Sequence, residues 1–187
     1  MKHLYVPDTQ IAKGRRVDHL KWMAYYAMDK LDNSDRIIFA GDWYDFPALS
    51  SYQAKGSKSM EGKRLADDLK AGRDAINLVQ EIWDKRGFAP KRYITLGNHE
   101  NRLNRMVDEN PVLLDGLDGL GLGFKEAGWK VFPFLQIAKL DGILYSHYFP
   151  HGANGKVMQT KRGAPSAKAQ TQRQMMSATA GHQQGFD

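Results

Sequence analysis

The chain contains no cysteine among its 187 residues, and this absence excludes several kinds of chemistry. Disulfides, thiolate metal sites and a cysteine nucleophile are all ruled out. The sequence also lacks a run of about 18 apolar residues, the length that a membrane-spanning helix requires. Its N-terminal MKHLYVPD has no apolar stretch of the kind found in secretory signals. We therefore expect a cytoplasmic protein without a membrane partner.

Acidic residues are missing from a long C-terminal window. No Asp or Glu occurs between Gly142 and Phe186, and the whole chain carries a net charge of +6. The window holds five basic side chains, namely Lys156, Lys161, Arg162, Lys168 and Arg173. This pattern is typical either of a solvated basic loop and helix or of a surface that meets a polyanion, because basic patches concentrate phosphate-bearing partners.

The length and the composition, 42% hydrophobic and 26% charged, indicate one globular domain over residues 1–187. Short apolar runs predict strands at 4–6, 36–40, 91–96, 130–134, 136–140, 143–146 and 175–180. Asp141-Gly142 indicates a hairpin turn that leads into the strand at 143–146. Helical spacing predicts helices at 16–31, from 65 to near 87, at 100–109 and at 166–174. Strands that alternate with helices favour an α/β sheet, in which ligands gather at the carboxyl ends of the strands.

Five predicted strands run into side chains that can bind metals. The motifs are Asp8-Thr-Gln10, Gly41-Asp42-Trp-Tyr-Asp45, Gly97-Asn98-His99-Glu100, His147, and Gly181-His182-Gln-Gln184. A single Asp after a strand is usually a turn or helix cap, but five such ends on one chain are hard to explain as caps. Clustered carboxylates repel one another unless cations neutralise them. Asp, Asn and His without Cys favour Mn, Fe, Zn or Mg, and two such ions can share a bridging carboxylate.

In this order, the motifs resemble the signature of the calcineurin-like metallophosphoesterases over residues 8–184. The resemblance implies a four-layer α/β fold, in which a β-sandwich is flanked by helices. It also implies two metal ions and hydrolysis of a phosphoester by a metal-held hydroxide. Resembling proteins continue beyond this point with further strands. We therefore expect a domain without the last strands of the fold, either because the sequence is a C-terminally truncated fragment or because those strands are absent.

The resemblance assigns metal ligands residue by residue. Asp42 is similar to the bridging carboxylate, and Asn98, His147 and His182 are similar to the other ligands of the second metal. Asp8 is similar to the carboxylate of the first metal. Gln10 and Gln184 stand where the family usually has histidines, and both departures fall on the first metal. An amide oxygen is usually a weaker ligand than imidazole. We therefore expect up to two divalent ions per chain, with Mn or Mg preferred over Zn at a weaker first site.

The same resemblance assigns catalytic and substrate-binding roles. His99 is expected to act as the general acid at the leaving group, with Asp45 orienting and charging its imidazole. The alternatives are a capping role for Asp45 and a structural role for His99. Arg102 and Arg105 are candidate phosphate ligands, as are Asn98 and His151, although arginines after this motif are more often exposed or ion-paired. Phe46 replaces the Arg that protein Ser/Thr phosphatases have after GDxxD, which weakens a phosphoprotein-phosphatase assignment.

Three functions follow as hypotheses. The first is a metal-dependent phosphoesterase acting on a phosphodiester, a nucleotide or nucleic acid, and a phosphomonoester fits almost as well. The second is a catalytically degenerate relative that binds nucleic acid or nucleotides, which the two glutamines favour. The third is a structural domain that uses one metal for stability.

Overall fold

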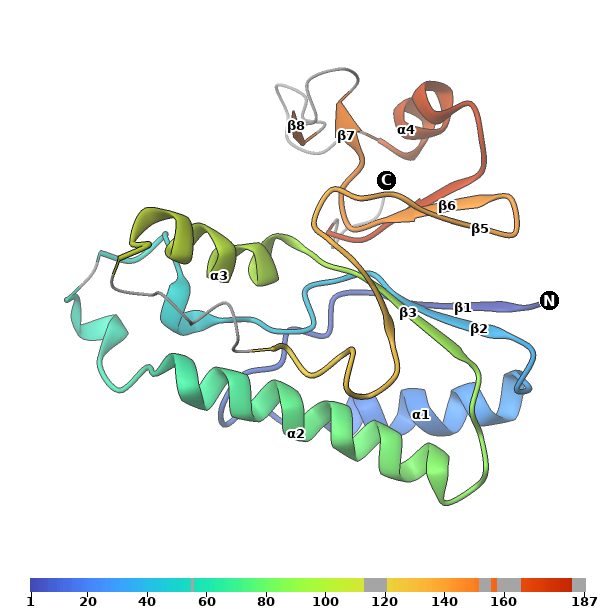
Figure 1. Cartoon of the computed structure of the whole chain (residues 1–187), viewed down its shortest axis with the longest axis horizontal. Helices are drawn as coiled ribbons and strands as arrows, with labels where there is room; N and C mark the ends of the chain where they lie inside the picture. The colour runs from blue at the N-terminus through green and yellow to red at the C-terminus, as the bar shows by residue number, and fades with distance from the viewer. Residues whose placement is uncertain (55, 113–120, 152–155, 158–165, 183–187) are drawn as a thin grey trace.

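The computed structural model describes residues 1–54, 56–112, 121–151, 156–157 and 166–182. It confirms a mixed α/β architecture, in which two β-sheets lie one above the other (Figure 1). Helices α1 (Asp18–Lys30) and α2 (Leu65–Asp84) cover the face of the larger sheet that is turned away from the smaller one. Within these described residues, no helix combines the length and the apolar character needed to cross a membrane.

The larger sheet is parallel and follows the order of the chain. It consists of β1 (His3–Val6), β2 (Arg36–Phe39), β3 (Lys91–Thr95) and β4 (Lys130–Phe132), in the order β1-β2-β3-β4. Because parallel crossovers share one hand, strands that advance in one direction place their connecting helices on the same face. The carboxyl ends of β1, β2 and β3 consequently lie along one edge, where polar side chains follow each strand.

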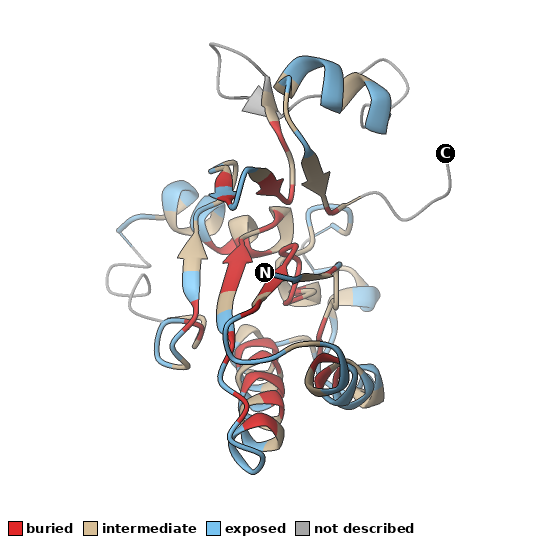
Figure 2. Ribbon diagram, turned by 90° about the vertical axis from the view of Figure 1, so that its right-hand side faces the viewer, coloured by how far each residue is buried: buried red, intermediate tan, exposed pale blue. Residues whose placement is uncertain are grey.

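Alternation along the strands divides the buried residues between two cores. Ile37 and Phe39 of β2 pack with α1 and α2, whereas Ile38 faces the second sheet. The Trp83 indole N–H donates to the carbonyl oxygen of Ala24 at 3.1 Å and so links α2 to α1. Figure 2 shows the buried residues gathered on the sheet and on the helix faces turned toward it.

The smaller sheet contains β5 (Ala138–Leu140), β6 (Ile143–Ser146) and β9 (Ala178–Ala180). β5 and β6 form the predicted hairpin through Asp141 and Gly142, with φ angles of 47° and 84°, as a type I′ turn requires. β6 and β9 are parallel. Helix α3 (Asn98–Glu109) begins shortly after β3. The remaining described elements are α4 (Ala167–Gln174), the short strands β7 (Pro150–His151) and β8 (Lys156–Val157), and 3-10 turns at Pro47–Leu49 and Lys58–Met60.

A polar cluster joins the two sheets at the hairpin turn. Arg36 on β2 donates two hydrogen bonds to the carboxylate of Asp141, at 2.6 and 2.9 Å. His3 on β1 contacts both Asp141, at 2.8 Å, and the Tyr145 hydroxyl, at 2.7 Å. The Arg36 and His3 hydrogen bonds hold the pKa of Asp141 well below its ordinary value of 3.8. The hairpin is thereby anchored to the larger sheet.

This cluster should make the stability of the fold depend on pH. The folded state lowers the pKa of Asp141, so its contribution to the free energy of unfolding is complete above about pH 4 and disappears as the pH falls toward the folded pKa. Asp141→Asn should therefore lower the melting temperature at pH 7 but converge with the wild type in strong acid. Melting curves between pH 7 and pH 2 test this, with Asp74→Asn in an exposed surface pair as the control. A difference between wild type and Asp141→Asn that does not change with pH would contradict it.

Candidate metal centre

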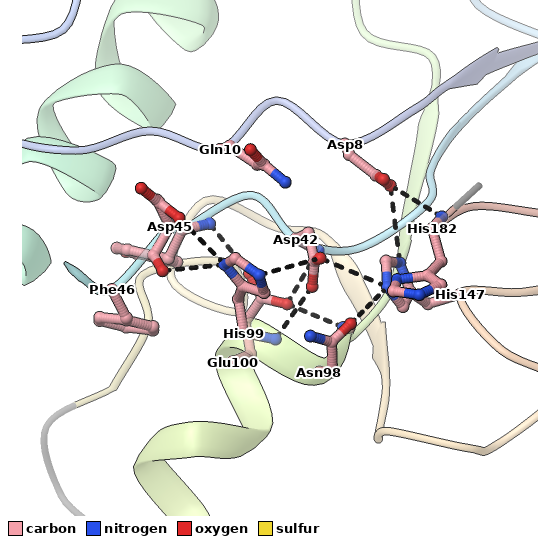
Figure 3. A network of polar contacts seen from close by, with 12 residues as sticks. Asp8, Gln10, Asp42, Asp45, Phe46, Asn98, His99, Glu100, His147 and His182 are labelled. Atoms are coloured by element: carbon pink, nitrogen blue, oxygen red, sulfur yellow. Dashed lines mark hydrogen bonds and ion pairs between the residues drawn. The ribbon is translucent and has the colours of Figure 1, made fainter. Parts of the chain in front are cut away.

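Five strand ends meet between the two stacked sheets (Figure 3). β1, β2 and β3 lead into Asp8, Asp42 and Asn98. β6 and β9 lead into His147 and His182. Within each sheet the strands concerned are parallel, so their carboxyl ends lie on the same side. The structure therefore brings together side chains that are far apart in the sequence.

Asp42, His147 and His182 form a group that can hold a metal ion. Each offers one ligand atom, and these atoms all lie within 4.8 Å of one another. Asp42 and His147 are each only 1% exposed. The amide oxygen of Asn98 lies 3.0 Å from His147 Nε2 and so borders the same space. Carboxylate, amide and imidazole ligands together suit Mn, Fe, Zn or Mg.

The hydrogen bonding of His147 leaves a lone pair directed into this group. Its Nδ1 lies 2.7 Å from the carbonyl oxygen of Ala40, which can only accept, so the ring proton is on Nδ1. Burial lowers the pKa of His147 to about 4 despite the nearby charge of Asp8, so the ring is neutral at pH 7. Its Nε2 lies 3.4 Å from Asp42 Oδ2 and 3.0 Å from Asn98 Oδ1. Acceptors that face one another in a buried space are stabilised by a cation between them.

Asp42 is a buried carboxylate in an unfavourable environment. Burial and the charge of Glu100 raise its pKa to about 7, although the nearby His99 lowers it. The backbone N–H of His99, in the first turn of α3, donates to Asp42 Oδ1 at 3.0 Å. A helix N-terminus favours negative charge, but only by about 0.3–1 kcal/mol at ordinary sites. A bound cation would provide the larger compensation that this carboxylate needs.

Asp8 and Gln10 lie beside the metal-capable group. Asp8 Oδ1 accepts the backbone N–H of His182 at 3.2 Å and lies 3.6 Å from His147 Nδ1. The backbone N–H of Gln10 donates to the carbonyl oxygen of Asp42 at 2.8 Å, and Figure 3 shows its side-chain amide extending from the same loop toward the group. Gln184 lies outside the described residues. A first metal site made of Asp8, Gln10, Asp42 and Gln184 therefore stays a prediction.

Glu100 organises the loop that carries Asp42. This side chain is 1% exposed, and its carboxylate accepts three backbone N–H groups: from Gly97 at 2.7 Å, from Tyr44 at 2.9 Å and from Asp42 at 3.0 Å. Burial raises the pKa of Glu100, and the amide hydrogen bonds act in the opposite direction. One side chain thus fixes the loop after β2 against the start of α3.

A second polar chain lies next to the metal-capable group. His99 Nδ1 lies 2.8 Å from the carbonyl oxygen of Asp45 and 3.2 Å from its carboxylate. Arg102, one turn later on α3, donates to the same carbonyl oxygen and to His99 Nε2, both at 2.8 Å. Arg15 reaches the other carboxylate oxygen of Asp45 at 2.7 Å. Asp45 is therefore a shared anchor for a histidine and two arginines.

The charge of His99 depends on these contacts. Burial disfavours the imidazolium, but the Asp45 hydrogen bond and the charge of Asp42 outweigh it, so the pKa of His99 is raised. The His99 hydrogen bond in turn lowers the pKa of Asp45, and the charge of Arg15 adds to this effect. While Arg102 donates to Nε2, that nitrogen must carry a lone pair. A proton can reach Nε2 only when Arg102 turns away.

Unusual backbone conformations coincide with the candidate ligands. Residues other than glycine rarely adopt a positive φ, yet Gln10, Asp42 and His182 have φ angles of 48°, 47° and 69°. Glycine permits close approach beside them, since a Cβ added to Gly97 would lie 2.0 Å from Asp42 Oδ1. Strain of this kind is concentrated at functional sites in many proteins.

The structure describes the side chain of only one of two further candidates, Arg105 and His151. Arg105 forms a 3.9 Å ion pair with Glu109 on the exposed side of α3, which is the common fate expected for such an arginine. The backbone of His151 belongs to β7, and its side chain lies outside the described part of the chain. A substrate contact by His151 therefore stays a prediction.

Three residues of the site were not expected from the sequence. Glu100 occupies the third position of α3, where a capping-box glutamate is common, and this signal was available. The Tyr148 hydroxyl lies 2.7 Å from His182 Nε2, and only its position next to His147 pointed to it. No local signal identified Arg15, because its contact with Asp45 joins two separate loops.

Comparison with known proteins identified no relative of this chain. No protein-family model, no curated protein and no solved structure matches this chain.

Proposed function

We propose that this chain is a metal-dependent phosphoester hydrolase of the calcineurin-like metallophosphoesterase type. Its substrate is a phosphodiester, a nucleotide or nucleic acid. One observation carries the proposal: ligand atoms of Asp42, His147 and His182 lie within 4.8 Å of one another, and the amide oxygen of Asn98 lies 3.0 Å from His147 Nε2. The order of the sequence motifs and the two stacked sheets flanked by helices support the same assignment.

The residues present fit a divalent cation such as Mn²⁺. Asp42, Asn98, His147 and His182 would hold it, and Asp42 would gain the positive partner that its burial demands. When bound, such an ion supplies a Lewis acid that activates water and screens the charge of a phosphate. Ala40 fixes the tautomer of His147 through its carbonyl oxygen, which is a common second contact for a metal-binding histidine.

Arg102 is the residue that would bind the phosphate. Its guanidinium group lies one helical turn from Asn98 and is held by the carbonyl oxygen of Asp45. A guanidinium group can donate two parallel hydrogen bonds to a phosphate and so stabilise the charge that develops on its oxygens. Turning toward the phosphate would remove the Arg102 hydrogen bond from His99 Nε2.

His99 is then free to protonate the leaving group. With Arg102 on the phosphate, Nε2 can carry a proton, and Asp45 favours the resulting imidazolium through Nδ1. Proton donation by a positioned histidine typically contributes about 10²–10⁴-fold to the rate. The contacts of His99 thus couple phosphate binding to the availability of an acid.

A metal-dependence assay tests the proposed function. The purified chain is treated with EDTA and then assayed with bis-p-nitrophenyl phosphate and with p-nitrophenyl phosphate, each with Mn²⁺, Mg²⁺, Zn²⁺ or EDTA. We expect Mn²⁺ to stimulate release of p-nitrophenolate at least about tenfold over EDTA, since the ion supplies the Lewis acid. Melting temperatures under the same conditions report binding of the ion itself.

The outcomes distinguish the three hypotheses. Metal-stimulated release from either ester supports a hydrolase, and the ratio of the two rates separates a diesterase from a monoesterase. A metal-dependent melting temperature without hydrolysis of any ester would contradict the hydrolase and favour a structural ion. Neither effect, together with salt-sensitive binding to DNA, would favour the non-catalytic relative.

A further inference from the structure

A groove leads from the candidate metal centre along helix α1. Its first part is a cavity of about 380 Å³, whose lining includes Asp8 and His182 on one side and Arg15, Arg16 and His19 on the other. A second cavity, of about 500 Å³, lies between β1 and α1. The two share Asp8 and His19 in their walls, so they form one continuous surface, which we call the α1 groove.

The far part of the α1 groove is lined by exposed aromatic side chains. Trp22 is 71% exposed and Tyr26 is 54% exposed, and both belong to its walls. The other three tryptophans, Trp43, Trp83 and Trp129, are all buried. A single exposed ring is common on protein surfaces, whereas two exposed rings in the wall of one cavity form the kind of apolar patch that marks a binding surface.

The near part of the α1 groove is basic. The side chains of Arg15 and Arg16 are 54% and 91% exposed, and each is paired with one carboxylate, Asp45 and Asp18 respectively. An ion pair as exposed as Arg16–Asp18 typically contributes at most about 1 kcal/mol, so a phosphate can compete for the Arg16 guanidinium group. The Asp45 side chain is only 14% exposed, so Arg15 is held more firmly than Arg16. The acidic side chains near this part of the groove include Asp8, Asp18 and Asp45, of which Asp8 adjoins the candidate metal centre.

We propose that the α1 groove binds single-stranded nucleic acid, with bases stacked on Trp22 and Tyr26 and backbone phosphates at Arg15 and Arg16. The proposal rests on the proposed phosphoesterase function, because the groove delivers the strand to the candidate metal centre. Aromatic faces beside a basic track are the combination by which proteins hold single strands, and they accept any base. The substrate is accordingly an oligonucleotide rather than a small phosphate ester.

The composition of the groove favours this occupant over a second copy of the chain. The core of a protein interface is depleted of charged residues and buries about 800 Å² per partner. The α1 groove instead carries Arg15, Arg16 and His19 at its centre and ends at Asp8 and His182. The guanidinium groups of Arg15 and Arg16 suit the phosphates of a nucleic-acid backbone, whereas they do not suit an apolar partner.

Binding of a labelled oligonucleotide tests the proposal. Anisotropy of a fluorescent twelve-nucleotide poly-dT strand is measured in EDTA at low salt, so that hydrolysis does not interfere. Trp22→Ala and Tyr26→Ala should each weaken binding about tenfold, as expected for loss of one stacked base. Tyr25→Ala is the matched control, because Tyr25 is 53% exposed on the same helix and does not line the groove. Arg16→Ala should make the slope of log affinity against log salt concentration shallower by about one, as for the loss of one phosphate contact. Arg86→Ala, just beyond the C-terminal end of α2, should leave the slope unchanged.

Tryptophan fluorescence gives an independent measurement. Because Trp22 is the one exposed tryptophan of the four, stacking of a base should quench it while the other three stay unaffected. Trp22→Phe should keep most of the affinity measured by anisotropy but lose the quenching. Trp22→Ala should lose both. Quenching that persists in Trp22→Phe would contradict stacking at this position.

The experiments distinguish an error in the groove proposal from an error in the proposed hydrolase function. Hydrolysis of bis-p-nitrophenyl phosphate does not use the far part of the groove, so Trp22→Ala should retain the wild-type rate on that ester. If the wild type hydrolyses the ester but does not bind poly-dT, the groove proposal is wrong and the hydrolase stands. If poly-dT binds through Trp22 without any hydrolysis, the hydrolase is wrong instead. A dimer in solution that Trp22→Ala dissociates would show that a second copy occupies the groove.

Discussion

Replacing Asp42 by asparagine should abolish metal-stimulated hydrolysis. The carboxylate supplies one of the three ligand atoms that lie within 4.8 Å of one another, and its Oδ2 faces the lone pair of His147. Loss of residues that merely support a metal ligand already costs about 10–100-fold, so loss of the ligand itself should cost at least about 100-fold. The rise in melting temperature caused by Mn²⁺ should disappear in the same variant.

The stability of this variant without metal separates function from folding. Asparagine has the shape of aspartate and can still accept the backbone N–H of His99, while it removes a buried charge. In EDTA the melting temperature of Asp42→Asn should therefore be unchanged or raised. Asp84→Asn, at the exposed end of α2, is the matched control and should hydrolyse the ester normally. Full metal-stimulated activity in Asp42→Asn would disprove the assigned centre.

Replacing Glu100 by alanine should have the largest effect on stability. Its carboxylate is buried and accepts three backbone N–H groups, so truncation leaves three donors without their acceptor. Each buried unsatisfied group costs about 1–3 kcal/mol, and partial relaxation makes about 3–5 kcal/mol a reasonable total. Such a loss should lower the melting temperature by roughly 10 °C in a chain of this size. Urea unfolding monitored by circular dichroism measures the free energy directly.

Two further variants test the cause of this loss. Glu109→Ala removes an exposed glutamate from the same helix and should change stability by no more than about 0.5 kcal/mol. Glu100→Gln keeps one acceptor oxygen but turns an NH₂ group toward the backbone donors, so it should fall between the wild type and Glu100→Ala. Equal stability of Glu100→Ala and Glu109→Ala would mean that the three hydrogen bonds contribute nothing.

Local patterns in the sequence predicted the elements of the fold well. Ile37, Ile38 and Phe39 form one apolar run, which predicted a strand. The structure confirms the strand and divides these residues between two separate cores. Asp141-Gly142 predicted the β5–β6 hairpin, because only a few residue pairs tolerate two positive φ angles. The predicted ends of elements differ from the observed ones. The strand expected at 130–134 ends at Phe132, because the next residue, Pro133, has no backbone N–H to donate.

The site was predictable where strand ends determine it. Asp8, Asp42 and Asn98 lie together because the parallel strands of one sheet end on one side, a rule that needs no knowledge of tertiary contacts. Their meeting with His147 depends in addition on how the two sheets stack. Glu100 and Arg15 were missed because their roles depend on backbone groups and side chains of separate segments. A buried charge is recognised only once its partners are known, since the sequence records neither burial nor distance.

The candidate ligands come from both sheets, so binding of a metal ion is linked to the folding of the chain. Asp42 belongs to the larger sheet and His147 to the smaller one, so a cation held by both would clamp the two layers together. If both sheets had formed but had not yet packed together, all the described ligand residues would be present, but they would be too far apart to bind one ion. The affinity for a metal ion would then report the final step of folding, and the proposed hydrolysis would require that step to be complete.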